Sequence, residues 1–168
     1  LLAESIRRMA PFMQSKAWLL ERQTLEREVI AAARHWRRTL LARGATGVNN
    51  EFWLQGTVFG IQVHGKADCL LRLEDGQLVI VDHKKSRTRK RKQRLEAGWD
   101  LQVELYRVMA GTAPEEGVEN ETRRLLSSSN RVGVAYHLMD DAGVLLHGAD
   151  VAPHGEFLPV ASDISHHA

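Results

Sequence analysis

The chain has 168 residues, of which 43% are hydrophobic and 26% charged, a balance that excludes a disordered tail, a collagen-like chain and a coiled coil. Its length favours one domain, whose core needs neither a metal nor a disulfide to fold. The formal net charge is only +2, and no stretch is long and apolar enough to cross a membrane.

The single cysteine limits the chemistry further. Because Cys69 stands alone, the chain can form no internal disulfide and no cysteine-ligated zinc or iron–sulfur site. A reducing, cytoplasmic location is therefore expected. The chain begins at Leu1 and has no apolar signal core. We expect one domain over residues 1–152, cut from a longer protein, and an irregular tail over residues 153–168, in which His166 and His167 are as typical of a tag as of the protein.

The first long element in the sequence is a predicted helix. Residues from Trp18 to Leu41 include no Gly or Pro, and Gly44 supplies a stop. Apolar residues recur at spacings of three and four, while Arg and Glu occupy the other face, so the helix is expected to lie against a sheet. The apolar positions are Leu19, Leu25, Val29, Ile30, Ala33, Trp36, Leu40 and Leu41.

The next segment alternates in the manner of strands. Glycines at positions 56, 60, 65 and 76 divide it into predicted strands near 50–55, 57–64, 66–73 and 77–84. A helix is predicted from Trp99 to Ala110, with Leu101, Leu105 and Val108 on its packing side. Residues 112–130 read as a loop, and two further strands are expected over 132–139 and 144–151, joined by a turn.

Positive charge is concentrated in one short run. Eight of the eleven residues from Lys84 to Arg94 are basic and none is acidic, which leaves 15 of the 23 basic residues to face 21 acidic ones elsewhere. A loop so polarised suits the capture of a polyanion, and a solvated loop or a localisation signal is the alternative. The eight are Lys84, Lys85, Arg87, Arg89, Lys90, Arg91, Lys92 and Arg94.

Two carboxylates flank a predicted hairpin, and the turn decides whether they meet. A two-residue turn at Asp75-Gly76 places Asp68 opposite His83, which makes no site. A three-residue turn with Gly76 in the left-handed region places Asp68 directly opposite Asp82, with Cβ atoms about 5 Å apart. Both registers are open at this point, and the site depends on the second; a carboxylate ending the apolar strand that begins at Leu78 is costly unless it is paired or metal-bound.

Facing carboxylates repel each other, so a positive group is expected between them. A hard divalent cation with oxygen ligands fits this position, and Lys84 lies on the same strand face as Asp82. A purely structural ion-pair cluster of Asp68, Asp82 and Lys84 is the alternative.

These residues resemble the active-site signature of the PD-(D/E)XK nuclease superfamily. The signature is Gly65-Lys66-Ala67-Asp68, followed 14 residues later by Asp82-His83-Lys84. The downstream segment from Gln102 to Tyr106 resembles the Gln-x-x-x-Tyr motif of the RecB-like exonuclease branch. The resemblance extends from His35 to Tyr106 and implies an α/β, restriction-endonuclease-like core with a central mixed sheet between helices.

The resemblance also implies roles for individual residues. Asp68 and Asp82 would bind Mg²⁺ or Mn²⁺, the main-chain carbonyl of His83 would complete the inner shell, and Lys84 would orient or activate water. His35 is the expected histidine ligand from the preceding helix, with a helix-surface histidine as the alternative. Glu28 and Glu51 are weaker candidates, more typical of solvated positions, and the side chains of His64 and His83 are expected to lie outside the site.

The expected activity is Mg²⁺-dependent hydrolysis of DNA by an exonuclease of repair or recombination, with a helicase or another domain of the parent protein as partner. A nuclease-like DNA-binding module without catalysis is the alternative. Contacts with nucleic acid are expected from Lys85, Arg87, Arg89, Lys90 and Arg91, with Gln102 and Tyr106 facing the same cleft. Trp99 suits either stacking on a base or a place in the core.

Overall fold

A six-stranded mixed sheet forms the centre of the molecule. The computed structural model describes residues 2–111, 124–126, 129, 131–141, 143–147 and 157–160. Strand order follows the sequence from β1 to β6; the β3–β4 and β5–β6 pairs are parallel and the other neighbouring pairs antiparallel. The strands are β1 (Ala45–Val58), β2 (Ile61–Leu73), β3 (Leu78–Lys84), β4 (Val132–Leu138), β5 (Gly143–His147) and β6 (Phe157–Val160).

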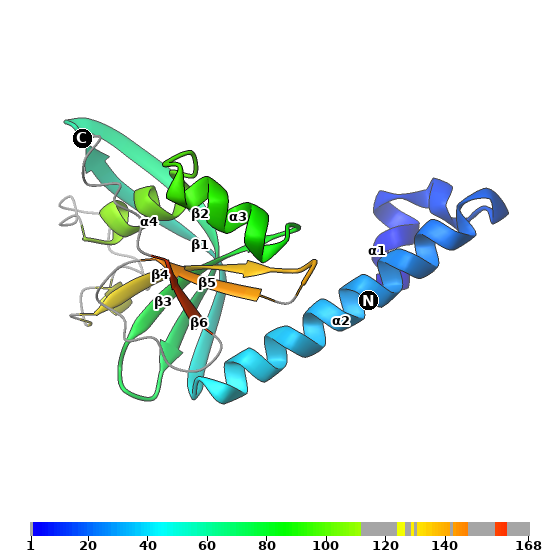
Figure 1. Ribbon diagram of the computed structural model, residues 1–168, viewed down its shortest axis with the longest axis horizontal. Coiled ribbons are helices and arrows are strands. Elements are labelled where there is room, and N and C mark those ends of the chain that lie inside the picture. Colours follow the sequence, from blue (N-terminus) through cyan, green and yellow to red (C-terminus); the bar gives the residue numbers. More distant parts are fainter. Residues whose placement is uncertain are drawn as a thin grey trace.

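Helices cover both faces of this sheet. Figure 1 shows α3 (Thr88–Glu96) and α4 (Gln102–Gly111) on one side and α2 (Leu19–Ala42) on the other. The N-terminal half of α2 runs away from the sheet, and α1 (Leu2–Met9), η1 (Pro11–Gln14) and η2 (Lys16–Trp18) gather at its far end (Figure 1). This arrangement confirms the predicted α/β, restriction-endonuclease-like fold with a central mixed sheet.

Alternation along β3 builds two separate cores. Leu78 and Ile80 are buried in the cluster that includes Val103, Tyr106 and Met109 of α4. Val79 and Val81 lie in the opposite cluster, against which Trp36 and Leu40 of α2 pack. A strand covered on both faces reads as a continuous apolar run, as Leu-Val-Ile-Val does here. Side chains at positions 82 and 84 therefore project toward α4, and that at 83 toward α2.

The long helix was predicted correctly, but its packing was not. It begins at Leu19 and ends at Ala42, close to the expected limits, and Gly44 follows with φ of +59°. The sheet reaches only its C-terminal part, and Leu19, Val29 and Ile30 stay 39–48% exposed. Regular apolar spacing predicts a face that can be buried, but not the length over which a partner covers it.

Two predicted strand breaks do not exist. Gly56 and Gly65 lie inside β1 and β2, paired with Val63 and Leu54, so the expected four strands are three, of which β1 and β2 are longer than predicted. At Gly65 the strand passes close to α4, since a Cβ there would be in ordinary contact with Met109 Cε, at 3.5 Å. A glycine in a strand that approaches a helix closely gives the same sequence signal as a turn.

The segment between β3 and β4 also differs from expectation. The predicted basic loop is mostly helix α3, whose first N–H at Thr88 is capped by the Asp141 carboxylate at 2.8 Å. Helix α4 begins at Gln102 rather than Trp99 and buries Val103, Tyr106 and Met109, whereas Leu101 and Leu105 are 55% and 37% exposed. The predicted packing side of this helix was therefore wrong.

The C-terminal third is described in part. Strands β4 and β5 agree with the prediction as far as His147. The expected irregular tail contains strand β6, which pairs with β5, so that prediction was wrong over Phe157–Val160. Most of the predicted 112–130 loop and the pair His166-His167 lie outside the described residues. No described helix combines the length and apolar character that spanning a membrane requires.

Candidate active site

The hairpin register brings the two predicted aspartates to adjacent positions. Cys69 pairs with Val81, and Leu73 N–H donates to the Gln77 carbonyl at 2.9 Å around a three-residue turn. Gly76 takes φ of +80°, the left-handed conformation that this turn requires. This is the register predicted for the three-residue turn, so the alternative that sets Asp68 opposite His83 is excluded; regular pairing ends at Cys69 and Val81, one residue before Asp68 and Asp82.

Asp82 is a buried carboxylate with two partners on the α4 face. It is 2% exposed; Oδ1 accepts a hydrogen bond from Gln102 Nε2 at 2.9 Å, and Oδ2 lies 2.6 Å from Lys84 Nζ. Burial raises the pKa of Asp82, and the ammonium of Lys84 opposes that rise. Stabilising its anion therefore depends on nearby positive charge.

Asp68 lies where the regular pairing of β2 ends. Its Oδ2 accepts a hydrogen bond from the His83 main-chain N–H at 2.8 Å, replacing a main-chain acceptor just beyond the last β2–β3 pair. On the other side, the β1–β2 ladder skips Asp68 and its neighbour Glu51, whose φ is +54°. A left-handed non-glycine residue beside a predicted catalytic residue fits the tendency of backbone strain to occur at functional sites.

The Glu51 side chain is exposed to solvent. Its carboxylate forms an exposed ion pair with Lys66 at 2.7 Å, and this contact lowers the pKa of Glu51. Glu51 thus behaves as the solvated residue that the sequence indicated.

Tyr106 ties helix α4 to both strands of the site. Its hydroxyl accepts a hydrogen bond from Gln102 Nε2 at 2.7 Å and donates to the Lys66 carbonyl at 3.1 Å. Burial raises the pKa of Tyr106, and the carboxylates of Asp82 and Asp68 contribute to that rise. Gln102 and Tyr106 therefore share one face, as their spacing predicts, and connect Asp82 to β2.

His35 does not join the aspartates, which corrects the expectation from the resemblance. Its ring is buried on the opposite side of the sheet, where Nδ1 lies 3.1 Å from Nε2 of His137. Nδ1 of His83 lies 2.9 Å from Nδ1 of the same ring, and Trp36 packs against both His83 and His137. The alternation of β3 explains the correction, because α2 covers the face toward which His83 points.

Sequence reasoning missed His137, the centre of this histidine cluster of His35, His83 and His137. Burial and the two neighbouring imidazoles lower the pKa of His137 to about 4. The signal that could have found it is the parallel pairing of β3 with β4, which aligns His83 with His137. That alignment depends on a crossover whose length the sequence does not fix.

The predicted DNA-contacting cations separate into two groups. Arg87, Arg89 and Lys90 are exposed. Arg91 instead turns inward and forms an ion pair with Asp100, with its guanidinium 4.9 Å from the centre of the Tyr136 ring. It is therefore part of a buried network and not of the exposed basic face, contrary to the prediction.

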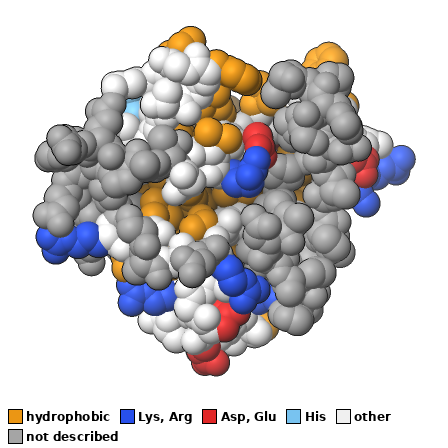
Figure 2. Space-filling view, turned by 90° about the vertical axis from the view of Figure 1, so that its left-hand side faces the viewer, with side chains coloured by type: hydrophobic (Ala, Val, Ile, Leu, Met, Phe, Trp, Pro, Cys, Tyr) orange, Lys and Arg blue, Asp and Glu red, His pale blue; other side chains and the backbone are white. Residues whose placement is uncertain are grey.

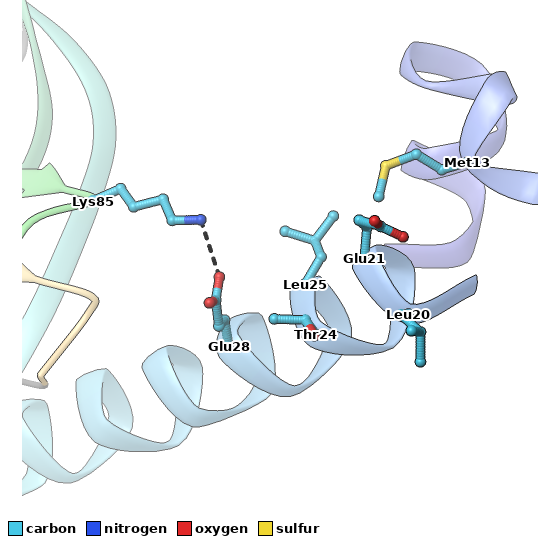
Figure 3. A pocket seen from close by; sticks show the side chains of 7 residues that line it. All are labelled: Met13, Leu20, Glu21, Thr24, Leu25, Glu28 and Lys85. Atoms are coloured by element: carbon cyan, nitrogen blue, oxygen red, sulfur yellow. Dashed lines mark hydrogen bonds and ion pairs between the residues drawn. The ribbon is translucent and has the colours of Figure 1, made fainter. Parts of the chain in front are cut away.

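Lys85 is held by α2. Its ammonium lies 3.0 Å from the Glu28 carboxylate, and this pairing raises its pKa. Figure 3 shows the pair at the rim of a hollow of about 430 Å³ beside the N-terminal half of α2. None of the predicted catalytic residues lines this hollow, whose walls are Met13, Leu20, Glu21, Thr24, Leu25, Glu28 and Lys85.

The aspartate site fits a cation that uses few protein ligands. Among the described residues, no three His, Cys, Asp or Glu side chains are grouped to hold a metal ion. Oδ2 of Asp82 is buried and ion-paired with the Lys84 ammonium at 2.6 Å. Mg²⁺ commonly binds through one or two carboxylates and keeps waters or substrate phosphates as its other ligands. Asp68, Asp82 and a main-chain carbonyl match that donor set.

The fold and this arrangement define an α/β protein with a restriction-endonuclease-like core and paired acids at the ends of adjacent strands. Residues 1–154 match the model of the PD-(D/E)XK nuclease superfamily, and the chain belongs to this superfamily. Membership supports a nuclease activity in general, of a kind that typically uses divalent metal ions. No curated protein shows significant similarity to the chain.

Proposed function

We propose that the protein is a Mg²⁺- or Mn²⁺-dependent nuclease that hydrolyses phosphodiester bonds in DNA. The observation that supports this most directly is the buried carboxylate of Asp82, held by Gln102, beside Lys84 and next in register to Asp68. Burial makes the ionised carboxylate of Asp82 costly, so the Lys84 ammonium and a bound cation would both stabilise it.

Each residue has a distinct role in the proposed reaction. Asp68, Asp82 and the His83 carbonyl would hold the cation, which when bound supplies neutralisation of phosphate charge and a lower pKa for water. The Lys84 ammonium orients the attacking water and stabilises negative charge on the phosphate. Gln102 fixes one oxygen of Asp82, and Tyr106 fixes Gln102, so that the carboxylate keeps one orientation.

The exposed cations of α3 would hold the DNA backbone. Arg87, Arg89 and Lys90 precede or open this helix and are free to meet phosphates, whereas Lys85 must first leave Glu28. Contacts of this kind carry little sequence information and weaken as salt rises.

Gln102 and Tyr106 further support a RecB-like exonuclease that works with a helicase or another domain in repair or recombination. An exonuclease needs a strand end, so linear DNA is degraded and covalently closed circular DNA is not. Equal cleavage of both forms would show an endonuclease instead.

The catalytic proposal is tested by comparing variants of the purified chain on DNA with Mg²⁺ or Mn²⁺. Asp82→Asn and Lys84→Ala are each expected to lower the cleavage rate by about 100-fold or more, because each removes charge from the reacting centre. Asp140→Asn and Lys16→Ala change exposed residues outside the site and serve as matched controls. Binding should persist in all four.

The outcomes are separable. Cleavage by Asp82→Asn at the rate of the unchanged protein would refute the proposed site. Absence of cleavage by the unchanged protein, together with salt-sensitive DNA binding, would favour the non-catalytic binding module.

A further inference from the structure

Trp99 is an exposed aromatic side chain on a fixed stretch of backbone. It is 77% exposed, although tryptophan is among the residues that proteins bury most extensively on average. Its main-chain N–H donates to the Arg94 carbonyl at 3.0 Å, and Gly98 before it takes φ of +69° at the end of α3. The indole thus projects from a chain segment that the helix end positions.

The residue after Trp99 is a buried anchor. Asp100 is 5% exposed, accepts a hydrogen bond from the Tyr136 hydroxyl at 2.5 Å and forms an ion pair with Arg91. Buried carboxylates with two such partners are costly to move, because displacement would leave charge unpaired. The backbone beside Trp99 is therefore fixed on both sides.

This anchored segment leads directly to the candidate active site. Gln102, three residues after Trp99, donates to Asp82, and Tyr136 is paired with Asp82 across the β3–β4 ladder. Gln102 and Tyr136 thus both contact strand β3, which carries Asp82. The backbone that carries the indole is therefore tied, through Gln102, to the strand that bears Asp82 and Lys84.

The surrounding charge indicates the kind of ligand. Exposed cations occur along the helix that leads to Trp99. One of them, Lys92, forms a long ion pair with Glu96, with 3.8 Å between nitrogen and oxygen. Figure 2 shows that on one face of the molecule Lys and Arg side chains occur in several separate groups, some of them beside Asp or Glu side chains. A planar apolar group beside cations matches a polyanion that carries unpaired planar rings, since bases stack on aromatic side chains and phosphates attract cations.

We propose that Trp99 is a stacking platform for one unpaired base of single-stranded DNA whose backbone follows α3. The inference deepens the proposed function and takes from it the location of the reacting phosphate. Duplex DNA keeps its bases stacked on each other and cannot offer one to the indole without unpairing. Trp99 therefore makes the site favour single strands over duplex.

The test measures binding without cleavage, in a chelator, so that it does not depend on catalysis. Trp99→Ala should weaken binding of a single-stranded oligonucleotide by about 5- to 150-fold, the range that loss of one base–aromatic stack gives. Trp99→Phe should retain most of the affinity. Trp53→Ala removes another exposed tryptophan, 58% exposed on β1, and should bind as the unchanged protein does.

A second arm localises the contact. In an oligonucleotide scanned with single abasic nucleotides, the unchanged protein should lose affinity at one position, and Trp99→Ala should lose nothing more there. The inference is overturned if Trp99→Ala binds single strands normally, or if it loses the same factor on blunt duplex. If Trp99→Ala weakens single-strand binding but the unchanged protein cleaves no DNA, the catalytic proposal is refuted and the stacking platform stands. If the unchanged protein cleaves DNA but Trp99→Ala binds single strands normally, the stacking platform is refuted and the catalytic proposal stands.

Discussion

Mild acid should destabilise the folded protein through His137. The ring is 2% exposed and stays neutral in the fold, because burial and the neighbouring imidazoles of His35 and His83 lower its pKa from the ordinary 6.5 to about 4. The unfolded chain therefore binds a proton between these two values that the folded chain does not. Stability must fall as pH falls through that window and level off below about pH 4.

The size of the effect follows from the two pKa values. Each unit of pKa corresponds to about 1.4 kcal/mol, so complete protonation costs about 3 kcal/mol. Between about pH 7 and pH 5 the loss is about 2 kcal/mol, because the unfolded histidine is then almost fully protonated and the folded one is still neutral. Burial also lowers the pKa of His83, which adds a contribution of the same sign.

Urea unfolding at several pH values measures this dependence. His137→Phe keeps a ring against Trp36 but cannot titrate, so most of the loss between about pH 7 and pH 5 should disappear relative to the unchanged protein. His64→Phe replaces an exposed histidine and should leave the dependence intact. If His137→Phe and the unchanged protein lose stability in parallel, the reasoning from the histidine cluster is wrong.

Two further predictions concern backbone and buried charge. Gly76→Ala should lower the free energy of unfolding by about 1 kcal/mol, because φ is +80° there although the added Cβ meets no atom within 4 Å. Gly111→Ala is the control, since its Cβ also meets no atom and its φ is not left-handed. Equal effects of the two substitutions in denaturant unfolding would contradict the argument. Arg91→Met should destabilise by about 3 kcal/mol because Asp100 is left buried and unpaired. Arg89→Met should instead weaken DNA binding at unchanged stability, and a reversal of these two results in melting and binding assays would refute the division of the cations.

The hairpin shows how far local sequence can predict a site. Turn chemistry around Gly76 and the alternation of the strand from Leu78 determine which residues oppose each other over a short loop, so the adjacency of Asp68 and Asp82 could be predicted. The partnership of Gln102 with Tyr106 was equally accessible, because four-residue spacing places both on one helix face.

What failed depends on contacts between distant segments. Helix α4 buries Val103, Tyr106 and Met109 against the sheet, whereas composition alone made Leu101 and Leu105 look equally suitable. A run of cations opposes helix formation locally, yet Asp141 from a distant turn caps α3 and Asp100 pairs with Arg91. Tertiary contacts of this kind override local propensity.

The His35 expectation failed for a related reason. The 33-residue separation from Asp68 says nothing about which face of the sheet the helix covers. Trp36 and Leu40 place α2 on the side of Val79 and Val81, and His35 goes with them.

Alternation along β3 leaves two chemically different environments back to back, separated by the thickness of a single peptide chain. His83 stands between Asp82 and Lys84 in sequence but faces the imidazoles on the far side. A change that shifts the imidazole rings would tilt the backbone of β3 and so displace Asp82 and Lys84 on the opposite face of the sheet. Variants in the histidine cluster could therefore resemble damage to the reaction centre in an activity assay, although their side chains never approach the substrate.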